Sequence, residues 1–238
     1  MIKSVIISGN EYPATVALVQ TAIEAEKNVL VSISEKKEAK TPENGALTYP
    51  WCKNSPISAR SMLLKAESSF ENLDCGFIFF DSEDFVSKFE GLSLENISRA
   101  NDEMLLSIEY LTYEFCKRFE MTKKGLLCFV LNPIHSFADT MRNPHLSPNI
   151  SHFSTLTSVA QAGFRSFAEN ISATASVSKS YKVLLLEKGI ESRDEFAKWV
   201  ISFADSYSDS EKIYTGKDCV KWHHIGAKLP ASRSFFGH

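Results

Sequence analysis

The chain has 238 residues, of which 44% are hydrophobic and 23% charged, and its formal net charge is −3. This length suits one α/β domain with a full core, and the charge gives no electrostatic reason to expect a nucleic acid or an anionic membrane as a partner. The first residues lead directly into a short apolar strand, and no apolar run approaches the roughly 18 residues of a membrane span. We therefore expect a cytoplasmic protein with one domain, residues 1–238, whose last residues, 225–238, form a tail.

Short apolar runs rich in Val, Ile, Leu and Phe alternate with helical patterns along the chain. The expected strands, in chain order, are VIISG, NVLVSIS, ALTYPW, CGFIFF, LLCFVLN, YKVLLLE and IYTGKDCVKW. The expected helices cover residues 14–27, 58–69, 94–120, 154–175 and 193–207, whereas 35–46 and 133–152 read as loops. Runs that are apolar on both faces and separated by helices indicate a parallel sheet covered on both sides. The predicted fold class is therefore α/β, a doubly wound Rossmann-type sheet of about seven strands.

The histidines and cysteines give little support for a metal site or a disulfide framework. His135, His145 and His152 share one proline-rich loop, but no helical i, i+4 pair or carboxylate set accompanies them. His223 and His224 are adjacent, so on a strand their side chains would point to opposite faces. The five cysteines lie mostly within apolar runs and read as free thiols. A nucleophile triad can be drawn from Ser136, His135 and Asp139, but no Gly-x-Ser-x-Gly turn marks the serine. We expect no metal.

The order of these pieces resembles the short-chain dehydrogenase/reductase family over nearly the whole chain. The stretches that carry the resemblance are ISG after the first strand, PWCKNSPISARSML, LDCGFIFFD, RSFAEN, EKG after the sixth strand, and YTGKDCVKW. The resemblance implies that a nicotinamide dinucleotide would lie at the carboxyl ends of the strands.

The loop after the first strand departs from the family pattern. The family has a Thr-Gly-x-x-x-Gly-x-Gly turn, whose backbone approaches the pyrophosphate. SGNEYPATV places Gly9, Pro13 and Thr15 at the three glycine positions, and Glu11 adds a negative charge. Pro13 removes an N–H donor, and the branched Thr15 side chain obstructs close approach. Alternatively, the stretch is simply a well-capped helix start, with Asn10 as cap and Pro13 in the first turn.

Other cofactor positions are also altered. The family's Asn-Ala-Gly after the fourth strand corresponds to Phe79, Phe80 and Asp81, which place two bulky rings where small residues make room. Glu35 stands where an acidic residue can follow the second strand, although an exposed glutamate beside Lys36 and Lys37 is more often part of a solvated turn. Gly189 remains after the sixth strand, but the next helix follows within a few residues, so the family's substrate lid is essentially absent.

The catalytic positions differ most. The family uses a Tyr-x-x-x-Lys pair in which the lysine lowers the pKa of the tyrosine that transfers the proton. Anchoring on RSFAEN places Phe153 and Thr157 at these positions, and no Tyr-x-x-x-Lys occurs between residues 120 and 180. Asn132 is the nearest polar residue to the family's serine, and Asn101 matches the asparagine of its long helix.

Two readings of the function follow. The favoured one is a catalytically degenerate member of the family that binds no cofactor and acts as a non-catalytic oligomeric partner or a ligand-binding subunit. The alternative is an NAD(P)-dependent oxidoreductase of the carbonyl or ketoacyl reductase type with a modified cofactor site. On the favoured reading the cofactor positions are vestigial, and NAD(P) is expected only if the alternative holds. These positions are Gly9, Pro13, Thr15, Glu35, Asp81 and Gly189.

The resemblance also implies assembly, as a homodimer or homotetramer or as a hetero-oligomer with an active homologue. The two long helices carry more apolar residues than one sheet-facing stripe requires, which predicts a helix-mediated dimer. These residues are Leu105, Ile108, Leu111, Phe115, Phe164 and Phe167. Phe235 and Phe236 in the tail are either part of a flexible end or a further subunit contact. Neither a nucleic acid nor a membrane is expected as a partner.

Overall fold

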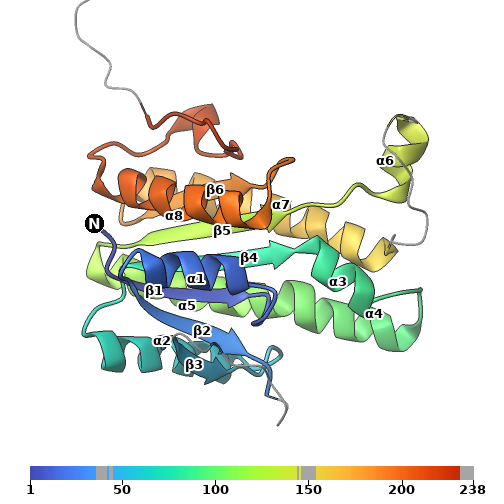
Figure 1. Cartoon of the computed structure of the whole chain (residues 1–238), viewed down its shortest axis with the longest axis horizontal. Helices are drawn as coiled ribbons and strands as arrows, with labels where there is room; N and C mark the ends of the chain where they lie inside the picture. Colours follow the sequence, from blue (N-terminus) through green and yellow to red (C-terminus); the bar gives the residue numbers. More distant parts are fainter. Residues whose placement is uncertain (36–41, 43–44, 144, 146–153, 231–238) are drawn as a thin grey trace, which may run out of the picture.

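A computed structural model describes residues 1–35, 42, 45–143, 145 and 154–230. A parallel sheet with the strand order β3-β2-β1-β4-β5-β6 forms its centre (Figure 1). The strands are β1 (Ser4–Gly9), β2 (Asn28–Ile33), β3 (Leu47–Pro50), β4 (Cys75–Asp81), β5 (Leu126–Asn132) and β6 (Lys182–Glu187). The chain runs outward from β1 to β3 and then returns to β4 on the other side of β1. This arrangement confirms the predicted doubly wound Rossmann-type fold.

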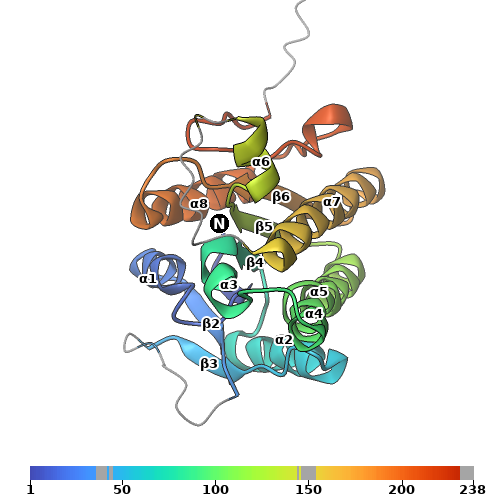
Figure 2. The same ribbon diagram turned by 90° about the vertical axis from the view of Figure 1, so that its right-hand side faces the viewer.

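The strands are apolar on both faces because helices cover both faces of the sheet. All residues of β1, β4 and β5 are buried except the half-buried Phe79. Helices α2 (Pro56–Phe70), α5 (Ser107–Thr122) and α7 (Thr155–Ser178) cover one face, and α1 (Val16–Glu24) and α8 (Arg193–Asp209) cover the other (Figure 2). Alternate residues of each strand therefore belong to two separate cores.

The long helix predicted over 94–120 consists of three pieces. Helix α4 (Leu94–Ala100) passes through a π-helical segment (Asn101–Leu106) into α5. Two short helices follow the carboxyl ends of neighbouring strands: α3 (Ser82–Lys88) after β4 and α6 (Phe137–Arg142) after β5. Neither helix was predicted from the sequence, and α6 lies within the stretch predicted as a loop. None of the helices in the described ranges is long and apolar enough to cross a membrane.

The apolar residues from which the dimer was predicted pack in the core of a single chain. Ile108, Leu111, Phe115 and Phe164 are at most 2% exposed and belong to the core under the sheet. Leu105 and Phe167 are half-buried against the same core. These six side chains therefore do not form the exposed apolar surface that the prediction of a helix-mediated dimer assumed. They give no reason to expect a dimer through these helices.

The seventh strand predicted at IYTGKDCVKW is wrong. The segment contains a 3-10 turn (Gly216–Asp218), and only an isolated parallel bridge joins His223 to Leu186 of β6. The reason is local, because the Tyr214 N–H donates to the Tyr207 hydroxyl at 3.0 Å instead of to a neighbouring strand. The described part of the chain therefore has a sheet of six strands.

Candidate functional site

The strand order reverses between β1 and β4, and in open parallel sheets ligands bind at the carboxyl ends of the strands beside such a reversal. Gly9 ends β1 here with φ +102°. A Cβ at this position would lie 2.2 Å from the carbonyl oxygen of Phe79, which is its partner in β4. The glycine is therefore required by strand contact and positive φ, irrespective of any ligand.

Most backbone N–H groups of the loop between β1 and α1 already donate hydrogen bonds within the chain. Three of its backbone N–H groups donate to carbonyl oxygens of this chain at 2.8–3.0 Å: Asn10 to Phe79, Tyr12 to Ser32 and Ala14 to Glu11. The N–H of Val16, the first residue of α1, donates to the Pro13 carbonyl oxygen at 3.1 Å. Pro13 has no N–H to offer. An anion at a helix N-terminus needs free amides, so this loop has few donors to give.

Asn10 and Pro13 do not start the helix, contrary to the alternative reading of this stretch. Helix α1 begins at Val16, and Thr15 precedes it without a side-chain capping bond. Pro13 lies in the turn before the helix. The Asn10 side chain instead accepts the Asp81 N–H at 2.7 Å and donates to Asp84 Oδ2 at 2.8 Å. This fully buried side chain therefore ties the end of β1 to the junction of β4 and α3.

Asp81 is the centre of a polar network at this edge. Its carboxylate is fully buried and accepts hydrogen bonds from Asn132 Nδ2 at 2.8 Å and from the Glu83 N–H at 3.1 Å. Arg193 Nη2 lies 3.0 Å from Asp81 Oδ2, off the hydrogen-bonding direction, and donates to Glu83 Oε2 at 2.8 Å. Burial raises the pKa of Asp81, while the Arg193 charge and the Asn132 hydrogen bond oppose this rise. Arg193 therefore joins the start of α8 to the end of β4.

The space enclosed beside this network is small. It amounts to about 20 Å³, bounded by α1, β4, β5, the β6–α8 turn and α8. The side chains around it are Ala14, Thr15, Ala17, Leu18, Phe79, Val130, Asn132, Lys188, Arg193, Phe196, Ala197 and Val200. This volume holds about one water molecule, whereas ligand sites typically occupy roughly 300–1,000 Å³. This space by itself is therefore too small for a dinucleotide.

The other predicted cofactor residues lie at the margin of this edge. Glu35 is exposed just after β2. Gly189 is exposed in the turn of residues 188–192, where its N–H donates to Glu191 Oε1 at 2.8 Å. This turn alone separates β6 from α8, in agreement with the expected short connection.

The residues predicted at the catalytic positions do not form one group. Phe153 lies outside the described residues, and so does its expected packing against Phe79 or Phe80. Thr157 is fully buried, and its Oγ1 has no hydrogen-bond partner among the residues that the structure describes. Asn132 binds Asp81, and Asn101 is exposed at the start of the π-helical segment. Within the described ranges no hydrogen bond joins Asn101, Asn132 and Thr157.

Phe79 and Phe80 point to opposite faces of the sheet, as neighbours in a strand must. Phe80 stacks on Phe164 of α7, with ring centroids 5.0 Å apart. Phe79 packs on the α1 and α8 side and lines the 20 Å³ space. Only Phe79 therefore reduces the space beside the reversal in strand order.

Gln161 was missed by the sequence analysis, although it follows Thr157 by one helical turn. Its Oε1 accepts the Ser82 hydroxyl at 2.6 Å and the Ile134 N–H at 2.8 Å, and its Nε2 donates to the Ile134 carbonyl at 3.1 Å. Gln161 thus fastens α7 to the chain leaving β4 and β5. A polar residue at i+4 from a predicted site position was the available signal.

The histidine-containing stretches have structural roles. Ser136 and Asp139 form the capping box of α6, with Ser136 Oγ donating to Asp139 Oδ2 at 2.6 Å, so the triad interpretation is wrong. The ring of His223 is buried and stacks on Tyr214 at 4.5 Å. Burial lowers the pKa of His223 to about 4. No group of three or more metal-ligating side chains occurs among the residues that the structure describes.

Comparisons with known proteins establish the fold and leave the family open. No family model matches the sequence. An uncharacterized protein of Treponema pallidum (strain Nichols) is 23% identical over 199 residues, which cover 82% of this chain and 83% of that protein. The fold is also found in solved structures of short-chain dehydrogenases, at lower identity.

Two structures illustrate this likeness. A protein from Burkholderia multivorans assigned as a short-chain alcohol dehydrogenase superimposes with a TM-score of 0.63 at 14% identity, over 94% of this chain and 96% of its own. A short-chain dehydrogenase from Streptomyces avermitilis gives a TM-score of 0.63 at 14% identity, over 95% of this chain and 89% of its own. At such identities the shared feature is the fold.

Proposed function

We propose that the chain is a catalytically degenerate protein with the short-chain dehydrogenase fold, which acts in the cytoplasm as a non-catalytic oligomeric partner or a ligand-binding subunit. The observation that supports this proposal best is the bridge between Arg193 and Asp81. It links α8 to β4 across the edge where a dinucleotide would lie, beside a space of about 20 Å³.

The chemistry of hydride transfer supports the same conclusion. A bound nicotinamide dinucleotide would supply the hydride, and the protein would have to supply and hold a proton at the substrate oxygen. The fully buried Thr157 has no ionisable group, and Asn132 uses its amide to hold Asp81. The side chains described around the enclosed space include no tyrosine, histidine, cysteine or carboxylate.

The experiment is a calorimetric titration of the protein with NADH and with NADPH, at low salt and at millimolar nucleotide. We expect no saturable heat for either. A micromolar dissociation constant for one of them would contradict the proposal. In that case, assays against ketones and β-ketoacyl thioesters decide whether the bound nucleotide is used.

The alternative, an oxidoreductase with a modified NAD(P) site, is supported by one observation. Lys188 and Arg193 both line the enclosed space, and the buried Thr15 Oγ1 beside them has no hydrogen-bond partner. If Arg193 left Asp81, the two cations could meet a phosphate group. An Arg193→Ala variant distinguishes the readings, because loss of measurable NADPH affinity would favour the alternative and equal absence of binding in both proteins would favour degeneracy.

The assembly part of the proposal is tested separately. Sedimentation of the purified chain at high concentration should show a dimer or tetramer if it assembles with itself. A strictly monomeric chain would leave only a heterologous partner, which co-expression with an intact homologue would reveal as a complex of the two chains.

A further inference from the structure

A large groove lies at the opposite edge of the sheet from the candidate site, where the strands begin. We call it the amino-edge groove. Its volume is about 1,550 Å³, and its lining residues are Met1, residues that precede β4, β5 and β6, and residues of the segment 208–230. Figure 1 shows where these strands and the C-terminal segment lie. The segments that form it come from distant parts of the sequence.

Positive charge gathers in this groove although the chain as a whole carries a net charge of −3. Seven lysines line it: Lys123, Lys124, Lys179, Lys182, Lys212, Lys221 and Lys228. Only four acidic residues do so: Asp74, Asp209, Glu211 and Asp218. The sequence showed no basic stripe because these lysines come together only in the fold. An excess of one sign in a concave surface concentrates its field and attracts ligands of the opposite sign.

Three of the lysines have partners that fix them in place. Lys182 Nζ donates to the carbonyl oxygens of Tyr207 and Ser208 at 2.9 Å each, at the end of α8. Lys123 donates to Ser180 Oγ at 3.1 Å, and Lys124 lies 3.4 Å from Asp74. These three lysines stabilise the walls of the groove.

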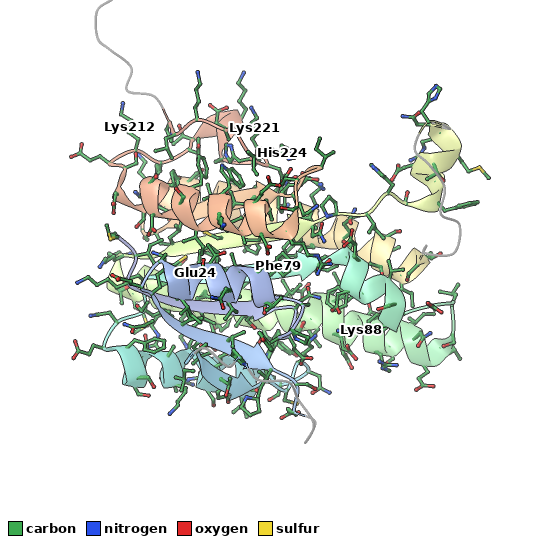
Figure 3. The ribbon with its side chains drawn as sticks, in the orientation of Figure 1. Glu24, Phe79, Lys88, Lys212, Lys221 and His224 are labelled. Carbon is green, nitrogen blue, oxygen red and sulfur yellow. The ribbon has the colours of Figure 1, made fainter. Side chains whose placement is uncertain are left out.

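Lys179, Lys221 and Lys228 are different. All three are exposed, and within the part of the chain that the structure describes none of them belongs to an ion pair. Figure 3 shows Lys221 and the neighbouring Lys212 projecting outward from the C-terminal segment, away from the sheet. The three exposed ammonium groups are therefore available to carboxylates of a ligand.

Apolar side chains line the groove together with the polar ones, and two of its aromatic donors are already used within the chain. Trp222 donates its Nε1–H to Glu169 at 2.8 Å, and Tyr214 donates its hydroxyl to the Lys228 carbonyl at 2.9 Å. Ile225 is 45% exposed, and Leu229 is half-buried. A ligand that fits the groove therefore carries both negative charges and apolar groups.

The same features disfavour nucleic acids. Single-stranded nucleic acids stack their bases on exposed aromatic rings, but Tyr181, Tyr214 and Trp222 in this groove are at most 8% exposed. Among the described residues no arginine lines the groove, so these residues do not supply the planar bidentate fork that recognises phosphates. Lysine ammonium groups beside exposed apolar side chains suit a carboxylate-rich peptide with some apolar residues better.

We propose that the amino-edge groove binds an acidic, partly apolar peptide segment of another protein. Carboxylates of the peptide would pair with Lys179, Lys221 and Lys228, and its apolar side chains would pack on Ile225 and Leu229. The groove and the candidate site lie at opposite edges of the sheet, so peptide binding is independent of dinucleotide binding.

The test measures fluorescence anisotropy of a fluorescein-labelled 14-residue peptide of alternating glutamate and leucine pairs, titrated with the full chain at low and at high salt. We compare the wild type with a triple variant, Lys179→Glu, Lys221→Glu and Lys228→Glu. The matched control is Lys65→Glu, Lys117→Glu and Lys198→Glu, which changes the net charge equally at exposed positions outside the groove. Circular dichroism confirms that each variant is folded.

We expect the groove variant to raise the dissociation constant of the peptide about 10-fold or more, and the control variant to raise it about 2-fold at most. The reason is that salt screens the charges that lie far from the bound peptide more than those in contact with it. Equal losses in the two variants would overturn the proposal. So would a glutamate-only peptide that binds as tightly as the mixed one, or a DNA duplex that binds more tightly. Self-association that the groove variant abolishes would show that a second copy of this chain is the occupant, and would overturn it too.

Discussion

Arg193 at the start of α8 lies 3.0 Å from the carboxylate of Asp81 at the end of β4, and the side chain of Asp81 is fully buried whereas that of Arg193 is 46% exposed. The pair therefore places one charge in the interior and its partner at the surface. Asn132 and the Glu83 N–H complete the environment of Asp81 by hydrogen bonds.

Replacing Arg193 alone should destabilise the fold more than replacing Arg193 and Asp81 together. Arg193→Met leaves a buried carboxylate without its cation, and we expect a loss of about 1–2 kcal/mol in unfolding free energy, less than for a fully buried pair because Arg193 is half-exposed. Adding Asp81→Asn should recover part of this loss. Urea denaturation of both variants measures the difference, and a double variant less stable than Arg193→Met would contradict the interpretation.

The stability should depend on pH through His223. Its folded-state pKa, about 4, lies below its ordinary value of 6.5, because burial beside Tyr214 disfavours the charged ring. Between pH 6.5 and 4 the unfolded chain therefore binds a proton that the folded chain does not, so stability falls as the pH is lowered through this window. The effect approaches about 2–3 kcal/mol below pH 4.

The variant His223→Phe preserves the stacking on Tyr214 and removes the titration. Its unfolding free energy, measured by urea denaturation from pH 7 to 4, should fall less steeply than that of the wild type. His224→Phe is the control, since His224 is exposed. Parallel curves for His223→Phe and the wild type would show that His223 does not control the slope.

Gly9→Ala should be severely destabilising, for two separable reasons. The φ of +102° is unfavourable for alanine, and the new Cβ would lie 2.2 Å from the Phe79 carbonyl oxygen. Gly91 also has a positive φ, of +80°, but a Cβ added there would meet nothing within 4 Å, so it isolates the backbone effect. We expect a loss of about 1 kcal/mol for Gly91→Ala and at least about 3 kcal/mol for Gly9→Ala, by thermal unfolding. Similar losses would argue against the contact with Phe79.

Thr157 gives a test of whether its position has any catalytic potential. Because its buried Oγ1 has no partner, Thr157→Val should be neutral or stabilising by up to about 1 kcal/mol. Thr157→Lys would bury an ammonium group and should destabilise the fold.

The double variant Phe153→Tyr with Thr157→Lys should show no turnover of ketones or β-ketoacyl thioesters, because restoring two residues of a catalytic unit does not restore the whole unit. Turnover by this variant would show that a cofactor site is present.

The sheet could be predicted because its strands are apolar on both faces and its helices are strongly amphipathic. The apolar composition of residues 213–222 led to the wrong prediction of a seventh strand. In the structure the Tyr214 N–H donates to the Tyr207 hydroxyl and not to a neighbouring strand. The Arg193 contact could not be read from sequence, since Arg193 and Glu83 lie 110 positions apart and neither has a local motif. The sequence SGNEYPATV shows that the glycine pattern of the short-chain dehydrogenase/reductase family is not present, but it does not show that the Asn10 side chain binds Asp81 instead of capping the helix.

The two hydrogen bonds between Gln161 and the backbone of Ile134 have a consequence for local opening of the molecule. Ile134 lies two residues beyond the end of β5, where an amide usually exchanges rapidly with solvent deuterium. Its N–H is held by a side chain of α7, so it can exchange only when that helix separates from the edge of the sheet. Deuterium uptake at Ile134 therefore reports the opening of α7 itself, and α7 and the exit of β5 should behave as one cooperative unit.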